Sequence, residues 1–508
     1  MKLRVRDVDL SAGGNLVVII SRADASLLDA FAGDRVLVKN SAARKETTAV
    51  IDIDVENKRI KKGEIGIFEE LLRLLEVKDK DLVDVTYTGH PKSLQYIKDK
   101  LDGKRLSESQ IREIVNDIVK NKFSDKELTY FVSGCYTKEL SLKEAAYLTK
   151  AIVDSGNKLF FKAKFVLDKH CVGGIPNNRT TMIVTPIIAS LGYIMPKTSS
   201  RSITSPAGTA DTMEVLAPVD LSHNKISDVI KKSNACIVWG GSMNLAAADD
   251  YLIRVRHPLS LDPEGMLLAS ILAKKKAVGA THVMIDIPYG YQSKFSSFKE
   301  AKKIGRKFVA LGKLLKMKVR VVYTDGSQPV GRGIGPTLEA TDVLSVLKGG
   351  GPKDLREKSI FLATEMLKMI GVKHAEDKVL DSLDTGKAYK KFLQIVELQG
   401  GKRKITLQYA KYSKEIKSKK TGHVIIINNK GISKIARIAG APEDKAAGLY
   451  LRAKKGEIVK KGQVLFTVYS ESKEKLESAL KAVSDSETFV IGNLPKSYFN
   501  RFNLFKRN

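Results

Sequence analysis

The chain has 508 residues, of which 43% are hydrophobic and 28% charged, a balance typical of folded domains rather than disordered chains. Lys and Arg outnumber Asp and Glu by 87 to 57, but the lysines are spread along the whole chain, so small anions are expected as ligands and nucleic acid is not. The chain has three distant cysteines without a CxxC pair, which argues against a disulfide scaffold and a structural zinc site and favours the cytoplasm. It has no apolar run of the ~18–20 residues that a membrane span needs, which argues against a membrane protein.

Residues 1–88 predict a small β-rich module. Apolar and β-branched runs at 16–20, 35–38 and 48–53 are typical of short strands, and the pattern at 67–75 predicts one amphipathic helix. No catalytic constellation lies in this stretch. We therefore expect a barrel-like module that serves assembly or support.

Residues 89–156 and 244–278 predict a helical domain in two pieces. Ser107 precedes a helical apolar pattern as an N-cap, and Ser141 with Glu144 forms the pattern of a capping box. Both signals predict helix starts.

Residues 157–243 and 279–348 predict an α/β domain with a mixed or parallel sheet. Apolar runs at 159–167, 193–197, 235–239, 282–287 and 319–323 alternate with loops and helices, which indicates parallel crossovers. In such sheets ligands bind beyond the carboxyl ends of the strands. From about residue 422 the pattern is β-rich again, so residues 349–508 predict a C-terminal α+β domain and the whole chain a multidomain α/β protein.

Two loops of this α/β domain, residues 168–174 and 199–209, are rich in Gly, Ser and Thr. Each follows a predicted strand and leads into a helix, where free N–H groups and the helix dipole favour an anion. Lys169 and Arg201 add positive charge. Ordinary strand-to-helix loops have similar compositions, but the pair together predicts a site for more than one anionic group.

The second loop resembles the signature S-G-R-G-L-x-x-T-G-G-T-x-D-x-x-E of the thymidine/pyrimidine nucleoside phosphorylase superfamily. Six positions match this signature: Ser199, Arg201, Gly208, Thr209, Asp211 and Glu214. Among the positions that depart from it are Ser200, Ser202, Pro206 and Ala207. The departures resemble the S-R-x-I-T-S form of the archaeal branch, the AMP phosphorylases, and the likeness covers about residues 91–500.

This resemblance implies a pentosyltransferase that uses phosphate to split AMP, with CMP and UMP as further substrates, into free base and ribose 1,5-bisphosphate. It implies no cofactor and no metal, because inorganic phosphate is the co-substrate. We expect a homodimer or a larger homo-oligomer.

The matching positions also imply a set of site residues. The phosphate ligands would be Lys169, Thr180, Ser199 and Thr209, while Cys171 stands where nucleoside enzymes carry a serine. The AMP-binding residues would be Gly174, Ser200, Arg201, Ser202, Ile203, Thr204, Ser205, Thr209, Ser270 and Lys294. Arg254 and Lys274 resemble positions for base recognition.

Two residues are expected to act in the chemical step. Asp262 lies between apolar neighbours, which could raise its pKa and keep it protonated as the proton donor, and the resemblance favours this role over that of a helix N-cap before Pro263. His170 would contact phosphate or ribose; alternatively, it is a structural histidine.

Lys294 separates nucleotide from nucleoside substrates. The matching loop of pyrimidine nucleoside phosphorylases is small and apolar, whereas a lysine here could pair with a 5′-phosphate. A solvent-facing loop lysine is the alternative. Three other functions stay open: a nucleoside phosphorylase for thymidine or uridine, a phosphoribosyltransferase of the anthranilate type, which needs magnesium, and a basic nucleic-acid-binding protein.

Overall fold

The computed structural model describes residues 1–13, 16–89, 91–202, 205–241, 245–256 and 261–493. Contacts divide the chain into two compact units. Unit 1 comprises Met1–Gly156 and Ala246–Ser270, and unit 2 comprises Asn157–Leu245 and Ile271–Asn508. Helices and sheets occur in both units, which confirms the multidomain α/β class. The four predicted domain boundaries stay predictions.

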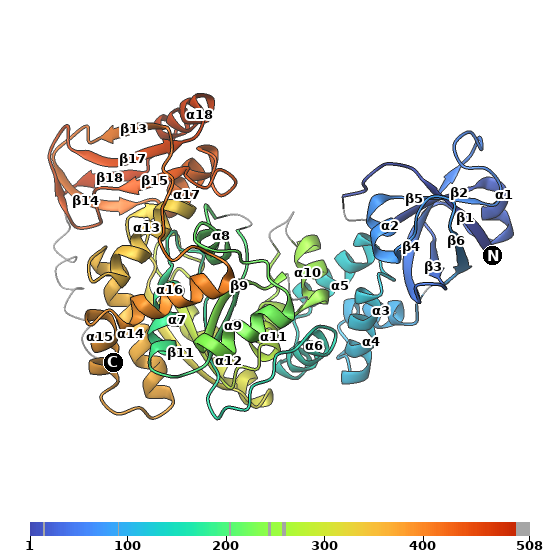
Figure 1. The fold of residues 1–508 in the computed structure, drawn as a ribbon, viewed down its shortest axis with the longest axis horizontal. Coiled ribbons are helices and arrows are strands. Elements are labelled where there is room, and N and C mark those ends of the chain that lie inside the picture. Colours follow the sequence, from blue (N-terminus) through green and yellow to red (C-terminus); the bar gives the residue numbers. More distant parts are fainter. Residues whose placement is uncertain (14–15, 90, 203–204, 242–244, 257–260, 494–508) are drawn as a thin grey trace. The chain divides into compact units, whose positions relative to one another are not determined.

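The first part of unit 1 is a closed barrel with the strand order β1-β5-β2-β4-β3-β6, drawn in blue in Figure 1. Its strands follow the two-residue period of a half-buried strand; in β3, for example, Val36 and Val38 are fully buried between more exposed neighbours. The prediction of a barrel-like module in this part of the chain is therefore confirmed. Its elements are β1 (Lys2–Asp7), β2 (Val17–Ser21), α1 (Arg22–Leu27), β3 (Arg35–Asn40), β4 (Lys45–Asp54), β5 (Glu64–Ile67), α2 (Glu69–Leu75) and β6 (Leu82–Tyr87).

The rest of unit 1 is helical. The predicted helix starts at Ser107 and Ser141 are confirmed, since both residues form complete capping boxes, and Ser124 forms a third. Behind the Ser141 cap, the buried Glu144 carboxylate accepts hydrogen bonds from the equally buried Lys100 and from Arg105. The helices are α3 (Ser93–Leu101), α4 (Glu108–Val119), α5 (Asp125–Thr137), α6 (Leu142–Asp154), α10 (Ala247–Arg256) and α11 (Glu264–Ala277), the last of which continues into unit 2.

Unit 2 contains the parallel strands that the sequence predicts. Three of them form a sheet in the order β11-β10-β7, β8 pairs with β9, and an isolated parallel bridge joins Val166 to Ile194 just before β7 and β8. The carboxyl ends of parallel strands lie at one edge of a sheet, so the loops after them are neighbours. The elements are β7 (Leu167–Cys171), α7 (Thr180–Ser190), β8 (Met195–Ser199), α8 (Thr209–Glu214), α9 (His223–Ser233), β9 (Ala235–Trp239), β10 (His282–Tyr289), α12 (Phe298–Leu314) and β11 (Lys318–Asp325).

Two of the differences between the predicted and the observed strand bounds affect the candidate site. The strand expected at 159–167 starts only at Leu167, so Asp168, Lys169 and His170 belong to β7 and not to the loop after it. The next strand likewise ends at Ser199 instead of residue 197. The reason is tertiary: Asp168 and Lys169 are fully buried among partners from α11 and α7, so polar side chains occupy an interior strand.

The chain after β11 adds helices against α7 and two antiparallel sheets. α14 and α16 share the large apolar core of α7, and the sheets have the orders β12-β15-β17-β13 and β16-β14-β18. The elements are β12 (Gly333–Ile334), α13 (Pro336–Leu347), α14 (Lys353–Met369), α15 (Ala375–Asp384), α16 (Lys387–Gln399), β13 (Tyr412–Lys417), β14 (Gly422–Ile427), α17 (Asn429–Ile438), β15 (Gly448–Leu451), β16 (Ile458–Val459), β17 (Val464–Ser470), α18 (Lys473–Ser484) and β18 (Phe489–Gly492).

Candidate active site

Lys169 lies in β7 with its side chain completely buried. Its Nζ donates a hydrogen bond of 2.6 Å to Thr180 Oγ1, at the first residue of α7, and approaches Thr181 Oγ1 at 3.3 Å. Burial lowers the pKa of Lys169, and the carboxylate of Asp286 opposes this shift. The structure thus brings together two of the predicted phosphate ligands, Lys169 and Thr180.

Asp168, the neighbour of Lys169 in β7, binds two buried lysines. Lys275 Nζ lies 2.7 Å and Lys197 Nζ 3.7 Å from its carboxylate oxygens. Burial lowers the pKa of Lys197 well below its usual value, and the ammonium group of Lys275 lowers it further. Asp286 similarly pairs with the nearly buried Lys358 at 3.1 Å. Two buried carboxylates, those of Asp168 and Asp286, therefore hold the lysines of this part of the interior in place.

His170 is the third polar residue of β7. Burial lowers its pKa well below the ordinary value, and the surrounding ammonium groups of Lys275, Lys197, Lys274 and Lys169 lower it further. The imidazole is therefore neutral at neutral pH. A neutral ring can donate one hydrogen bond and accept another.

Cys171 is the last residue of β7. Burial raises the pKa of its thiol to about 12, so a thiolate is not the reactive form, and Asn178 Nδ2 donates a hydrogen bond of 2.9 Å to its sulfur. Gly174 follows in the loop with a φ of +60°, and it is exposed. Its backbone is thus open to an incoming group.

Arg201 in the second loop is held by carboxylates. Its guanidinium donates to Glu214 at 2.8 Å and to Asp211 at 3.4 Å, and it lies over the Trp239 ring at 5.1 Å. The hydrogen bond from Arg201 lowers the pKa of Glu214 to about 2. Burial alone would raise this pKa, and a second hydrogen bond, from Lys445, helps to lower it. In this geometry Arg201 ties the loop to α8 instead of pointing freely at a ligand.

The serines of the same loop are held in several ways. Ser199 Oγ donates to Val238 O at 3.2 Å, Ser202 N donates to Asp211 Oδ2 at 2.7 Å, and Ser200 is exposed. The Ser202 hydroxyl also bonds to Ser205. Ile203 and Thr204 lie outside the described residues.

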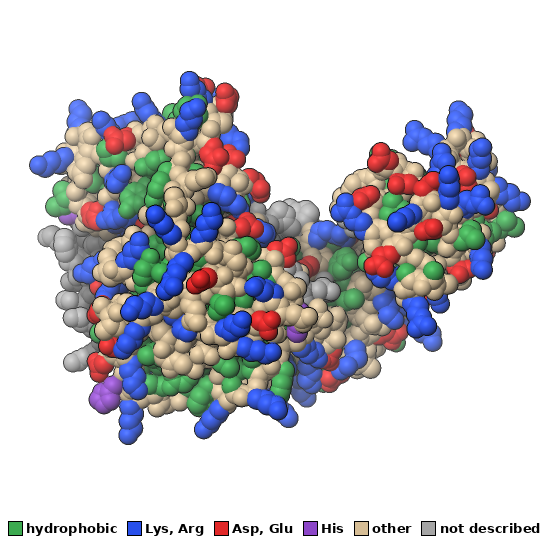
Figure 2. Space-filling view, viewed as in Figure 1, with side chains coloured by type: hydrophobic (Ala, Val, Ile, Leu, Met, Phe, Trp, Pro, Cys, Tyr) green, Lys and Arg blue, Asp and Glu red, His purple; other side chains and the backbone are tan. Residues whose placement is uncertain are grey.

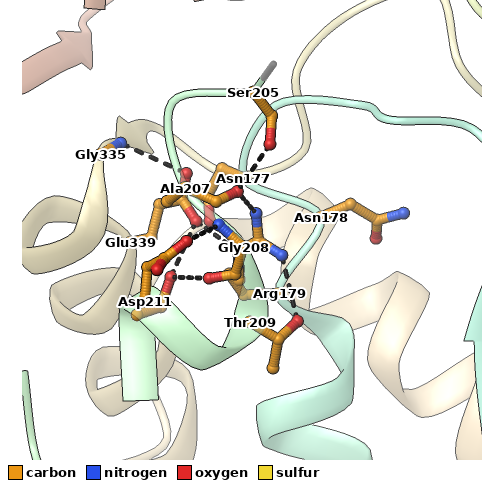
Figure 3. Close-up of polar contacts among 12 residues, drawn as sticks. Asn177, Asn178, Arg179, Ser205, Ala207, Gly208, Thr209, Asp211, Gly335 and Glu339 are labelled. Carbon is orange, nitrogen blue, oxygen red and sulfur yellow. Dashed lines mark hydrogen bonds and ion pairs between the residues drawn. The ribbon is translucent and has the colours of Figure 1, made fainter. Parts of the chain in front are cut away.

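Arg179, which the sequence analysis missed, joins the two loops (Figure 3). It directly precedes Thr180, and its guanidinium donates to Glu339 Oε2, to Ala207 O at 2.5 Å and to Thr209 Oγ1 at 3.1 Å. Glu339 comes from α13, is fully buried, and also accepts from Thr212 and from the Gly335 N–H. No signal within the loops could reveal this partner, because Glu339 lies 160 positions after Arg179 along the chain.

Lys294 lies in the loop between β10 and α12, and it is exposed. The turn around it is ordered by its neighbour: Ser293 Oγ donates to Gly290 O at 2.9 Å and to Phe295 O at 2.6 Å. The loop therefore presents Lys294 on a defined turn.

Two predicted site residues, Asp262 and Ser270, belong to unit 1. Ser270 Oγ donates to Asp249 Oδ2 at 2.6 Å, Asp249 lies 3.9 Å from Arg256, and Arg256 lies 3.6 Å from Asp262. The sequence predicted apolar neighbours for Asp262. The structure corrects this prediction, because the guanidinium of Arg256 also lies beside the Asp262 carboxylate. Asp249 and Arg256 are connecting residues that the sequence analysis missed. Arg254 pairs with Asp125 at 2.7 Å.

The described residues contain no group of three or more His, Cys, Asp or Glu placed to hold a metal ion. No described helix combines the length and apolarity needed to cross a membrane. In Figure 2, Lys and Arg side chains are interspersed with Asp and Glu and do not form a single stripe on the face drawn.

Three family models match the chain. Residues 94–156 match the helical bundle domain of the glycosyl transferase family, residues 163–389 match its a/b domain, and residues 423–489 match the C-terminal domain of pyrimidine nucleoside phosphorylase. The fold is also similar to that of anthranilate phosphoribosyltransferase from Thermus thermophilus, with a TM-score of 0.50 and 16% identity over 60% of this chain and 98% of that one. Fold and matches together define a protein of the glycosyl transferase type with a phosphorylase C-terminal domain.

Individual proteins that are similar to almost the whole chain identify the family within this class. AMP phosphorylase of Thermofilum pendens is 41% identical over 97% of this chain and 95% of its own, and that of Methanocaldococcus jannaschii is 43% identical over 95% of both. A Legionella pneumophila (strain Paris) protein, provisionally named a thymidine phosphorylase, is 44% identical over 86% of this chain and 85% of its own. The chain belongs to the AMP phosphorylase family.

Proposed function

We propose that this protein catalyses the phosphorolysis of AMP to adenine and ribose 1,5-bisphosphate, with CMP and UMP as further substrates. The observation that carries the proposal is the group formed by Lys169, Thr180 and Thr209, which Arg179 joins across two loops in a chain of this family. One ammonium and two hydroxyl groups suit the oxygens of a phosphate. We expect the active form to be a homo-oligomer.

In the proposed reaction a phosphate oxygen attacks C1′ of the ribose while the bond from C1′ to the base breaks. The carbon passes through an oxocarbenium-like state, and the departing adenine receives a proton at N7. No covalent intermediate with the protein is needed, so catalysis depends on positioning, charge and one proton transfer. We assign the proton to Asp262.

The attacking phosphate is assigned to Lys169, Thr180, Ser199 and Thr209. Lys169 supplies the charge, and its burial strengthens its attraction for an anion because the surroundings screen charge weakly. His170 adds a hydrogen bond from a neutral ring. This assignment places inorganic phosphate, not a protein nucleophile, as the reacting group.

The 5′-phosphate of AMP is assigned to Lys294 and to the loop of residues 200–205, with Gly174 as a backbone contact and Ser270 as a further AMP-binding residue. The exposed Lys294 supplies a cation for this contact. Arg201 contributes by holding the loop through Glu214.

The test is release of base by purified protein, with AMP, CMP, UMP, adenosine, thymidine and uridine each assayed with and without phosphate. We expect phosphate-dependent adenine release from AMP and at least about tenfold lower kcat/KM for every nucleoside, the loss that a missing charge-assisted contact to the 5′-phosphate would cause. Preference for thymidine or uridine would instead support the nucleoside phosphorylase. Loss of activity with a chelator would support a magnesium-dependent phosphoribosyltransferase.

A further inference from the structure

Arg179 occupies an unusual place between the two loops. Its backbone lies in the segment between β7 and α7, immediately before Thr180, while its side chain reaches the second loop at Ala207 and Thr209 (Figure 3). It is the N-cap residue of α7 and its side chain is nearly buried. One side chain therefore fixes the distance between two predicted phosphate ligands, Thr180 and Thr209.

The direction of the hydrogen bond to Thr209 has a chemical consequence. A threonine hydroxyl carries one hydrogen, and a guanidinium can only donate. Because Thr209 Oγ1 accepts from Arg179 Nη1, its own hydrogen points away from the guanidinium and remains to be donated. Arg179 thus sets Thr209 as a donor, which is the role that binding a phosphate oxygen requires.

Glu339 keeps the guanidinium in this orientation. Its carboxylate binds Arg179 Nε and Thr212 Oγ1 through one oxygen, and the Gly335 N–H through the other. Three hydrogen bonds from three different groups fix the plane of the carboxylate and, with it, the plane of the guanidinium. A lysine at position 179 could balance the charge of Glu339 but could not reproduce the planar fork to Ala207 and Thr209.

We infer that Arg179 is a positioning residue for phosphate, which acts through Thr209 and is itself held by Glu339. The inference rests on the proposed function for the identity of the anion. It predicts that substitutions at 179 and 209 affect the same step.

The experiment is a double-mutant cycle with Arg179→Lys and Thr209→Val, read out as the KM for phosphate at saturating AMP and as the Kd for inorganic phosphate by calorimetry without AMP. Each single variant should weaken phosphate binding about tenfold. The double variant should be no weaker than Thr209→Val alone, because the two residues act as one unit. Effects that multiply to about a hundredfold, or an Arg179→Lys variant with unchanged binding, would overturn the inference.

A second pair of substitutions separates positioning from folding. Arg179→Met combined with Glu339→Leu replaces the buried ion pair by apolar side chains, an exchange that is often neutral for stability. We expect a cooperative unfolding transition whose Tm is lowered by a few degrees, because the Gly335 N–H and the Thr212 hydroxyl lose an acceptor, and the same loss of phosphate affinity, about tenfold. Normal phosphate affinity in this folded variant would show a purely structural pair. Arg356→Lys, at a more exposed ion pair of 2.6 Å with Asp384 between α14 and α15, is the control for an arginine-to-lysine exchange outside the site.

The two readouts distinguish failure of the inference from failure of the proposed function. If the wild-type protein binds phosphate but releases no adenine from AMP, the proposed function is wrong, and the coupling is still measured on the phosphate Kd. If it turns over AMP but the cycle shows no coupling, only the inference is wrong.

Discussion

The Nζ atom of Lys275 lies 2.7 Å from Oδ2 of Asp168, and both side chains are almost completely buried. Lys275 comes from the second half of α11, and Asp168 precedes Lys169 in β7. The pair therefore connects a helix to the strand that carries a predicted phosphate ligand. Lys197, also buried, shares the same carboxylate.

Replacing Asp168 by Asn should destabilise unit 2 strongly. It would leave Lys275 and Lys197 buried without a carboxylate, and removing one partner of a buried pair costs about 3–5 kcal/mol. Thermal and urea unfolding of the variant at pH 7 measure the loss. Asp228→Asn, at an exposed ion pair, should change stability by less than about 1 kcal/mol. Equal stability of the two variants would contradict the prediction.

Replacing Lys169 by Met should weaken phosphate binding without removing AMP binding. The ammonium group is the buried cation beside Thr180, and a charge-assisted contact of this kind is worth about 1.5–3 kcal/mol, or roughly ten- to a hundredfold in KM for phosphate. Initial rates over a range of phosphate concentrations give the value. Lys353→Met, an exposed lysine on α14, is the control and should leave KM unchanged.

Replacing Asp262 by Asn should slow the chemical step. An amide cannot give the leaving base a proton, so kcat should fall by about 10²- to 10⁴-fold, while the Kd for phosphate stays the same. Single-turnover adenine release and phosphate calorimetry measure the two quantities. A fall in phosphate affinity with normal kcat would remove Asp262 from the role of proton donor.

Replacing Lys294 by Ala should reduce the preference for a nucleotide over a nucleoside. If the lysine binds the 5′-phosphate, kcat/KM for AMP falls by about tenfold or more, and kcat/KM for adenosine is unchanged. Lys302→Ala, on the neighbouring helix α12, controls for general loss of positive charge. An equal fall for both substrates would argue against a phosphate contact.

Glu144 should make the helical part of unit 1 sensitive to acid. Burial alone would raise its pKa, but the backbone N–H groups of Leu106 and Ser141, the Ser141 hydroxyl and Arg105 together lower it to about 2, from an ordinary value of 4.5. Because the folded state lowers this pKa, the stabilisation is complete above about pH 4.5 and is lost as the pH falls toward 2.

The comparison of wild type with Glu144→Gln tests this prediction. At pH 7 the variant should be about 3 kcal/mol less stable or worse, since it leaves Lys100 buried without its carboxylate. The difference should shrink steadily below pH 4.5, as wild-type Glu144 also becomes neutral. A difference that is constant from pH 7 to pH 3 would show that the charge of Glu144 contributes nothing.

The sequence predicted elements well where local signals act alone. The caps at Ser107 and Ser141 mark real helix starts, and the apolar run at Ala235–Trp239 is a strand with the predicted bounds. These features depend on residues close together in the chain, namely hydroxyls that cap nearby N–H groups and β-branched side chains in an interior strand.

The sequence failed where partners come from far along the chain. Asp168 and Lys169 follow an apolar run, so the pattern predicts them in the loop after the strand, yet they lie in the strand itself, where Lys275 and Thr180 satisfy them. The role of Arg179 depends on Glu339 in the same way. Such pairings follow from the tertiary fold, which no local pattern contains.

The closed sheet at the start of the chain limits how that module can meet other molecules. Every one of its described strands has a neighbour on both sides, so it offers no free edge to which an extended peptide could add itself as another strand. A binding partner must instead recognise the exposed side chains of the module, which include the large apolar side chains of Phe31 and Leu27. Polar substitutions at Phe31 and Leu27 would therefore change the binding surface of the module and leave the hydrogen bonds between the barrel strands intact.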